Sequence, residues 1–137
     1  MAGSFSISLS RFADKANGQI KQAVQKIAME TFSRVIYRTP VDTGRLRANW
    51  GAQVGNPYSG TAQTFDKEGN ATVAKAQNVV KGWSGQGSVY LCNNLSYASV
   101  MEYGRANGQP GSMQSPQGMV RVTLAEMQSG YAEKAAR

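Results

Sequence analysis

Residues 39–50 read TPVDTGRLRANW, and this stretch divides the chain into a helix, a turn and a strand. Pro40 ends the helix before it, because the residue preceding a proline is driven out of the α-helical region. Asp42 and Thr43 carry side-chain oxygens that can accept hydrogen bonds from the free amides of a following helix. Gly44 permits the tight backbone that such a turn needs. The stretch therefore predicts a compact turn between two regular elements.

Two apolar residues of the same stretch are predicted to enter the core. Leu46 lies in a short helix that residues 44–47 begin, and Trp50 lies where residues 48–54 start to read as a strand. A buried tryptophan contributes a large apolar area, and its indole N–H needs an acceptor.

Upstream of the turn, residues 12–38 are predicted to form a long amphipathic helix. Apolar residues recur every three or four positions, for example at Ile20, Val24 and Ile27, which is the spacing of one helical face. Before this helix, residues 4–10 read SFSISLS. Such strict alternation is typical of a half-buried strand.

Downstream of residue 54, loops alternate with short elements in what we interpret as a single domain over residues 1–137. Extended loops rich in Gly, Asn and Ser are expected at about 55–72 and 104–116. The other predicted elements are a helix that begins at Thr72 with Thr72 as its cap, a strand over 88–93, a short helix over 97–103 closed by Gly104, and a helix over 116–136 with Ser115 as cap and Pro116 at its first position.

The composition narrows the class of protein. Lys and Arg together number 15 against 8 Asp and Glu, a net charge of +7 in 137 residues, which suits contact with nucleic acid, anionic lipid or an acidic protein. The chain has no histidine and one cysteine. This removes His-based nucleophile systems, histidine metal ligands and an internal disulfide. No apolar run is long enough to span a bilayer, and the N-terminus lacks the features of a secretion signal, so no membrane association is expected.

The remaining chemistry-bearing residues form no catalytic constellation. Asp66 and Glu68 are a weak candidate cation site, and a polar turn is the favoured interpretation. Cys92 lies in a predicted strand, where a small buried residue is favoured over a nucleophile. Glycines 82, 85 and 87 precede a strand, whereas a dinucleotide-binding loop would follow one. No metal or cofactor is therefore expected.

Two groups of side chains carry competing interpretations. Tyr90, Tyr97 and Tyr103 could stack on bases, although core packing is favoured. Four arginines converge around the helix end and the turn, and they could form salt bridges or contact phosphate or a partner. These possible DNA-lumen or partner-facing residues are Arg34, Arg38, Arg45 and Arg47.

Two motifs resemble a known family. Residues 39–50 look like the signature TPVDTGxLRxSW, and residues 89–104 resemble a strand followed by N-x-x-YAxxxE[FY]G. Both signatures belong to the HK97 gp10-like family of phage tail-completion and head–tail connector (neck) proteins. The motif residues, which suit turns and packing, are Pro40, Asp42, Thr43, Gly44, Leu46, Trp50, Tyr97, Ala98, Glu102, Tyr103 and Gly104.

The resemblance implies an α+β fold in which a small, mainly antiparallel sheet packs with a long N-terminal amphipathic helix and a C-terminal helix. It implies a structural virion protein of the head–tail junction, made in the host cytoplasm and acting by assembly without catalysis. Its expected partners are copies of itself in a ring, generally six-fold, neighbouring neck and tail tube proteins, and the DNA that passes through the channel. The two long loops are expected to reach neighbouring subunits.

The alternative function is a small basic protein that binds DNA non-specifically through the four arginines. A steep salt dependence of duplex binding would favour this alternative. A hydrolase or nuclease is disfavoured by the lack of histidine and of clustered carboxylates.

Overall fold

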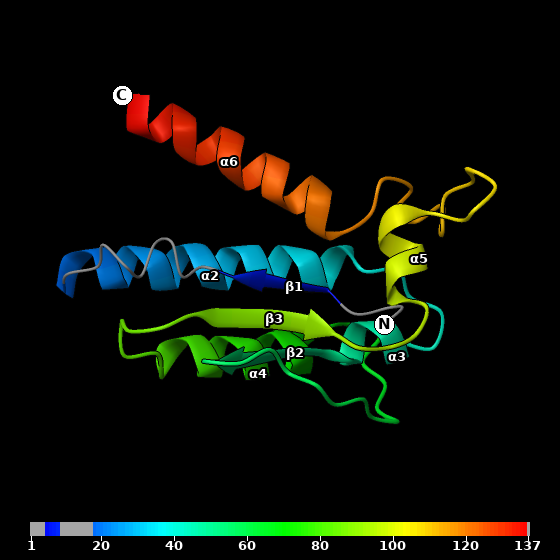
Figure 1. The fold of residues 1–137 in the computed structure, drawn as a ribbon, viewed down its shortest axis with the longest axis horizontal. Coiled ribbons are helices and arrows are strands. Elements are labelled where there is room, and N and C mark those ends of the chain that lie inside the picture. The colour runs from blue at the N-terminus through cyan, green and yellow to red at the C-terminus, as the bar shows by residue number, and fades with distance from the viewer. Residues whose placement is uncertain (1–4, 9–17, 137) are drawn as a thin grey trace.

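The structure is a computed structural model that describes residues 5–8 and 18–136, with side chains described from Lys21 to Gly130. Figure 1 shows how the helices and strands of this part of the chain are arranged. They are β1 (Phe5–Ser8), α2 (Gly18–Arg38), α3 (Arg45–Ala48), β2 (Trp50–Val54), α4 (Asn70–Lys81), β3 (Val89–Asn93), α5 (Ala98–Tyr103) and α6 (Val120–Ala136).

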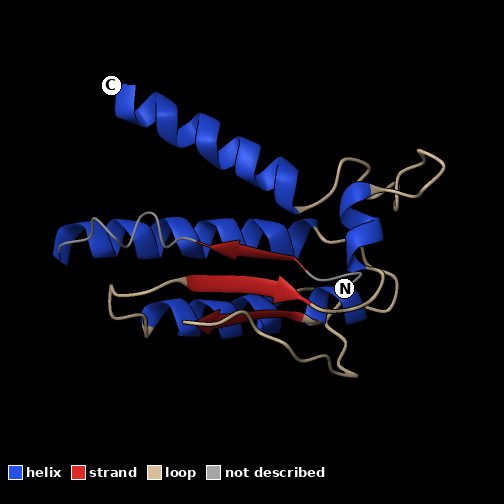
Figure 2. Cartoon of the chain, in the orientation of Figure 1, coloured by secondary structure: helices blue, strands red, loops and turns tan. Residues whose placement is uncertain are grey.

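The three strands form one antiparallel sheet in the order β1-β3-β2. Ile7 pairs with Leu91 on one side of β3, and Ala52 pairs with Leu91 on the other. Figure 2 shows the sheet with α2 and α4 running along its strands, and the two helices pack side by side on one face of it. The predicted α+β class, with a mainly antiparallel sheet, a long helix near the N-terminus and a C-terminal helix, is confirmed.

The core lies between the sheet and the two helices α2 and α4. Val89 and Leu91 alternate along β3 and are buried in the same cluster as Phe32 of α2 and Val80 of α4. The predicted apolar face of the long helix is confirmed for α2, since its buried members recur at helical spacing: Val24, Ala28, Phe32, Val35 and Ile36. The predicted helical residues 12–17, and Ser4, Leu9 and Ser10 of the predicted first strand, lie outside the described residues.

Two helices begin at other residues than predicted. Thr72 does not cap α4, which begins at Asn70; Gly69 precedes it with φ +88°. Ser115 and Pro116 do not start α6, which begins at Val120, and the Ser115 hydroxyl donates to the Arg38 carbonyl at 2.5 Å. In both cases a carboxylate outside the helix accepts backbone N–H groups of its first turn.

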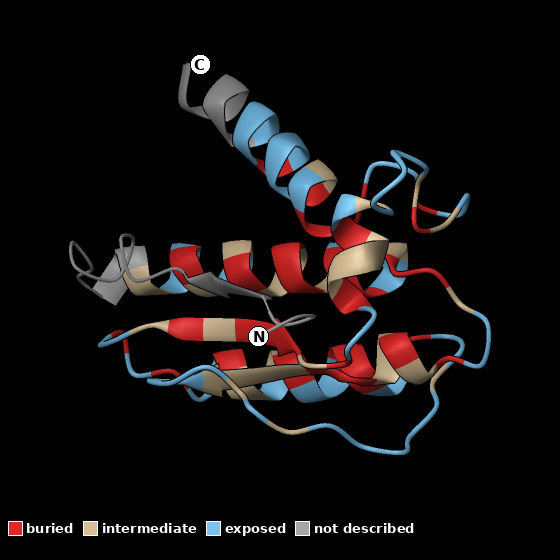
Figure 3. Cartoon of the chain, turned by 45° about the vertical axis from the view of Figure 1, so that its right-hand side comes forward, coloured by how far each residue is buried: buried red, intermediate tan, exposed pale blue. Residues whose placement is uncertain are grey.

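The C-terminal helix leaves the body of the molecule at an angle. Its first turns contact α2, and Met127 is buried, whereas Gln128, Ser129 and Gly130 are exposed (Figure 3). No helix in the described part of the chain combines the length and apolar character that a membrane span requires.

Candidate functional site

The two sequence motifs meet at one end of the molecule, where α3 and α5 lie on the right of Figure 1. They enclose a small pocket of about 260 Å³. The pocket is lined by Pro40, Val41, Asp42, Thr43, Gly44, Arg45, Leu46, Tyr97, Met101, Gly111, Ser112 and Gln114. We call this region the motif end.

The turn between α2 and α3 depends on glycine at position 44. Gly44 has φ +89°, and a Cβ there would lie 2.7 Å from the backbone N of Lys67. Its carbonyl accepts the N–H of Asp66 at 3.0 Å. Thr43 Oγ1 accepts the N–H of Arg45 at 3.3 Å, whereas Asp42 is exposed and forms no hydrogen bond with the described residues. Thr43 and Gly44 therefore shape the turn, and Asp42 is available to solvent.

Asp66 provides the cap of α4. Its Oδ1 accepts the N–H of Gly69 at 3.0 Å, and its Oδ2 accepts the N–H and hydroxyl of Thr72 at 2.9 and 2.8 Å. Partial burial alone would raise the pKa of Asp66, but these hydrogen bonds and the charge of Arg47 outweigh it, so the pKa is lowered. A carboxylate at a helix N-terminus is also favoured by the helix dipole.

We expect Asp66→Ala to lower the free energy of unfolding by about 1 kcal/mol near neutral pH, as loss of a helix cap does. Because the folded pKa lies below the unfolded value of about 3.9, the carboxylate stabilises the fold above that pH and ceases to do so as the pH falls through the folded pKa. Urea unfolding of both proteins should therefore show a stability gap at neutral pH that narrows below about pH 4. An equal gap at both pH values would contradict this role of Asp66.

Glu102 caps α6 from a different helix. Its side chain is 1% exposed, and its carboxylate accepts the N–H groups of Met119, Val120 and Arg121 at 2.8, 2.7 and 3.0 Å. Arg121 Nε donates to the same carboxylate at 3.0 Å. A Cβ at Gly118 would lie 2.5 Å from the Glu102 carbonyl oxygen. The second motif thus fixes where α6 begins.

The prediction that the motif tyrosines pack in the core is wrong. Tyr97 is 36% exposed and Tyr103 is 63% exposed, whereas Ala98 between them is fully buried. The guanidinium of Arg121 lies 5.0 Å from the centre of the Tyr103 ring, a cation–π contact. Gly104 ends α5 with φ +89°, as predicted. With Met113, which is also exposed, these tyrosines leave apolar surface at the motif end.

The long loops are anchored to the body of the molecule. The Gln114 side chain accepts the N–H of Val41 at 2.8 Å and donates to its carbonyl at 3.1 Å. Likewise, Asn49 Oδ1 accepts the N–H of Ala62 at 2.8 Å, and Asn94 donates to the Tyr58 carbonyl at 2.7 Å. Only part of each loop is therefore available to a neighbour.

The four predicted arginines are divided between two places. Arg47 donates to the carbonyls of Lys67, Tyr37 and Thr39 at 2.6 to 2.8 Å, and burial lowers its pKa. Its Nε is buried without a hydrogen-bond partner. Arg45 donates to the Ala62 carbonyl at 3.3 Å. Both guanidinium groups hold backbone segments of the motif end together.

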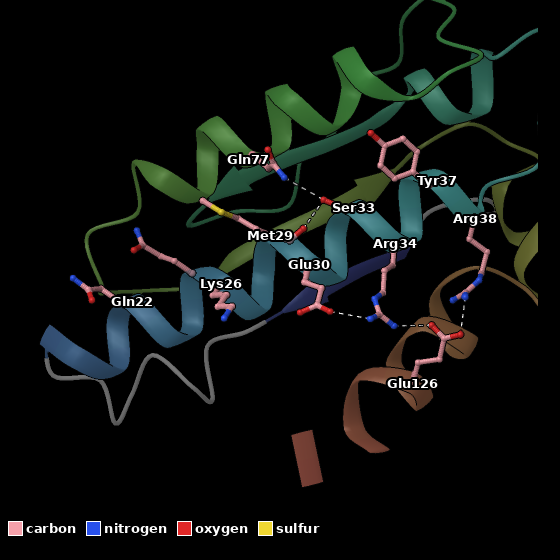
Figure 4. A pocket seen from close by; sticks show the side chains of 11 residues that line it. Gln22, Lys26, Met29, Glu30, Ser33, Arg34, Tyr37, Arg38, Gln77 and Glu126 are labelled. Atoms are coloured by element: carbon pink, nitrogen blue, oxygen red, sulfur yellow. Dashed lines mark hydrogen bonds and ion pairs between the residues drawn. The ribbon is translucent and has the colours of Figure 1, made fainter. Parts of the chain in front are cut away.

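Arg34 and Arg38 instead hold α6 against α2. Figure 4 shows both side chains directed toward Glu126, at 3.1 and 2.7 Å. Hydrogen bonding from Arg38 is the main cause of the lowered pKa of Glu126. Arg34 also pairs with Glu30 at 2.8 Å. These pairs border an open groove of about 1010 Å³ along the outer side of α2, between α4 and α6.

The structure also shows where Cys92 and Asp66 lie, the residues considered as a nucleophile and as a cation ligand. Cys92 is a buried residue of β3, as predicted. Asp66 serves as the cap described above. No group of three or more Cys, Asp or Glu side chains capable of holding a metal ion occurs within the described residues.

Sequence reasoning missed the side chains that act across long separations. Gln114 lies in a stretch that reads only as a loop, and Ser115 was predicted to cap a helix; nothing local marks either as a partner of Val41 or Arg38. The capping role of Asp66 was easier to predict from the sequence, because Asp66 precedes Thr72, at the start of a predicted helix, by only six residues.

Comparison with known proteins connects this architecture to one family. Residues 4–104 match the model of the HK97-gp10-like family, described as "Bacteriophage HK97-gp10, putative tail-component". No curated protein and no solved structure matches the chain. The matched residues include both motifs and every described element from β1 to α5. The chain therefore belongs to the HK97 gp10-like family of bacteriophage tail components.

Proposed function

We propose that this chain is a structural subunit of the phage head–tail junction, a tail-completion, tail-terminator or neck protein that forms a ring and lets DNA pass. The observation that carries this proposal is the family match over residues 4–104. In this proposal the protein acts by assembly, and its partners are copies of itself, generally in a six-fold ring, with adjoining connector and tail tube proteins.

The motif end supports the proposal as a contact surface. Its turn, its two helices and the segment around Gln114 are held by hydrogen bonds, so the exposed side chains of Tyr97, Tyr103 and Met113 project from an ordered base. Tyr97 lines the pocket and Tyr103 lies beside Arg121, so these exposed side chains offer a neighbouring subunit separate apolar contacts at this end. A closed ring requires one patch of the subunit to meet a different patch of its neighbour.

The alternative, non-specific DNA binding through the four arginines, receives little support. Arg34 and Arg38 are paired with Glu126, and Arg47 and Arg45 donate to backbone carbonyls. Contact with phosphate would have to replace these internal interactions.

Addition of the purified protein to phage tails that lack it tests the proposal. We expect native mass measurement and electron microscopy to show a ring of this subunit at the head-proximal end of the tail. Met113→Ser should reduce the occupied fraction without unfolding the subunit, and Val54→Ser, at an exposed apolar residue at the opposite end of β2 from Trp50, is the matched control. A protein that stays monomeric beside tails, or that binds along the whole tube, would contradict the proposed role.

A further inference from the structure

The end of the molecule opposite the motifs carries basic side chains that are not engaged in ion pairs. Lys21 and Lys26 lie in the first half of α2, and Lys81 is the last residue of α4 (Figure 1). None of the three forms an ion pair with a described residue. Together with the turn over residues 82–87, these lysines form what we call the lysine end.

Most carboxylates in the described part of the chain lie away from this end. The nearest carboxylate along α2 is Glu30, one turn beyond Lys26, and it is paired with Arg34. Asp66 and Glu102 cap helices near the motif end. Lys26 and Lys81 are exposed and Lys21 is partly buried, whereas the four predicted arginines form hydrogen bonds or ion pairs within the fold.

Hydrogen bonds from the side chains of Gln25 and Trp83 hold the turn over residues 82–87 in place. Gln25 Nε2 donates to the carbonyls of Val80, Lys81 and Trp83 at 3.1 to 3.4 Å. The indole of Trp83 is buried beneath the turn and donates to the Gln86 carbonyl at 2.9 Å. The Gln25 amide thus donates to carbonyls at the C-terminal end of α4, where the helix dipole is negative. These hydrogen bonds reduce the repulsion between the carbonyls and an approaching anion.

The same turn leaves room for a ligand to reach the backbone. Gly87 has φ +78° and no heavy atom within 4 Å of the position that a Cβ would occupy. At Gly85, a Cβ would lie 3.3 Å from Cδ of Lys21. The aliphatic part of Lys21 therefore packs along the turn and carries its ammonium group to the edge of it.

We propose that the lysine end contacts the phosphate backbone of duplex DNA, which makes it the surface of the subunit that faces the DNA channel. An ordered, glycine-rich turn whose Trp83 side chain is buried, flanked by flexible ammonium groups, suits sequence-independent contact with phosphates. Figure 4 shows Lys26 on the outer side of α2, beside the groove, where a long polyanion can reach it. The statement that this surface faces a channel rests on the proposed function. The contact with phosphate can be measured on the purified chain alone.

Duplex binding as a function of salt concentration tests the assignment. The test variant is Lys21→Gln/Lys26→Gln/Lys81→Gln, and the matched control, Lys67→Gln/Lys75→Gln/Arg105→Gln, removes the same charge from exposed cations elsewhere. We expect the test variant to bind a short fluorescent duplex at least about tenfold more weakly at low salt, and its slope of log K against log salt to fall by up to about 2.7, since each phosphate contact contributes about 0.9. The control should change affinity by less than about threefold.

Three results would overturn the assignment: no duplex binding by the unaltered protein, equal losses in both triple variants, or equal competition by polyglutamate, which would indicate an acidic protein partner. The same variants should still assemble on tails. Weaker DNA binding with intact assembly on tails would support the assignment of the lysine end. DNA binding by a protein that forms no ring would contradict only the proposed function.

Discussion

Glu102→Ala is expected to release the start of α6 and to lower the free energy of unfolding by about 3 kcal/mol, because each buried backbone donor left without an acceptor costs about 1–3 kcal/mol. The substitution removes the acceptor of the three backbone N–H groups and of the Arg121 side chain. Buried donors left without an acceptor cost more than the hydrogen bonds themselves contribute. Urea unfolding followed by circular dichroism would measure the loss, and hydrogen exchange over residues 120–130 would locate it.

Arg121→Gln measures the contribution of the Glu102–Arg121 ion pair separately from that of the helix cap. The Arg121 side chain is half exposed, whereas the Glu102 carboxylate is buried, so loss of the arginine should cost about 1 kcal/mol or less. If both variants lost the same stability, the exposed pair and not the backbone cap would hold α6. A loss below about 1 kcal/mol in Glu102→Ala would contradict the capping role itself.

Trp50→Ala is expected to lower the free energy of unfolding by about 3–5 kcal/mol, as truncation of a buried aromatic side chain does. Trp50 is 4% exposed in the main core. Its indole N–H donates to Thr39 Oγ1 at 2.7 Å, and that hydroxyl donates to the Val35 carbonyl at 2.7 Å. The substitution therefore creates a cavity and breaks the link between β2 and the end of α2.

The matched control is Phe65→Ala, because Phe65 is an aromatic residue that is 58% exposed. It should change stability by no more than about 0.5 kcal/mol, the usual range for surface positions. Equal effects of the two substitutions in urea unfolding at 25 °C would show that Trp50 does not support the core.

Local constraints in the sequence were enough to predict most elements. The end of α2 followed from Pro40, because a proline acts on its immediate neighbour. The strand β3 and the glycine that ends α5 followed in the same way, from β-branched residues and from a position that needs positive φ. The burial of Leu46 and Trp50 followed from a motif in which the turn and the apolar residues stand close together.

Tertiary structure alone decided the partners of the charged groups. Glu102 meets the start of α6 across 17 to 19 residues, and Arg38 meets Glu126 across 88. Sequence patterns report the preferences of a residue and its near neighbours, whereas a hydrogen bond depends on where two distant segments are placed by packing. For this reason the motifs and the net charge could be interpreted from the sequence, but which basic side chains stay unpaired on the surface could be known only from the fold.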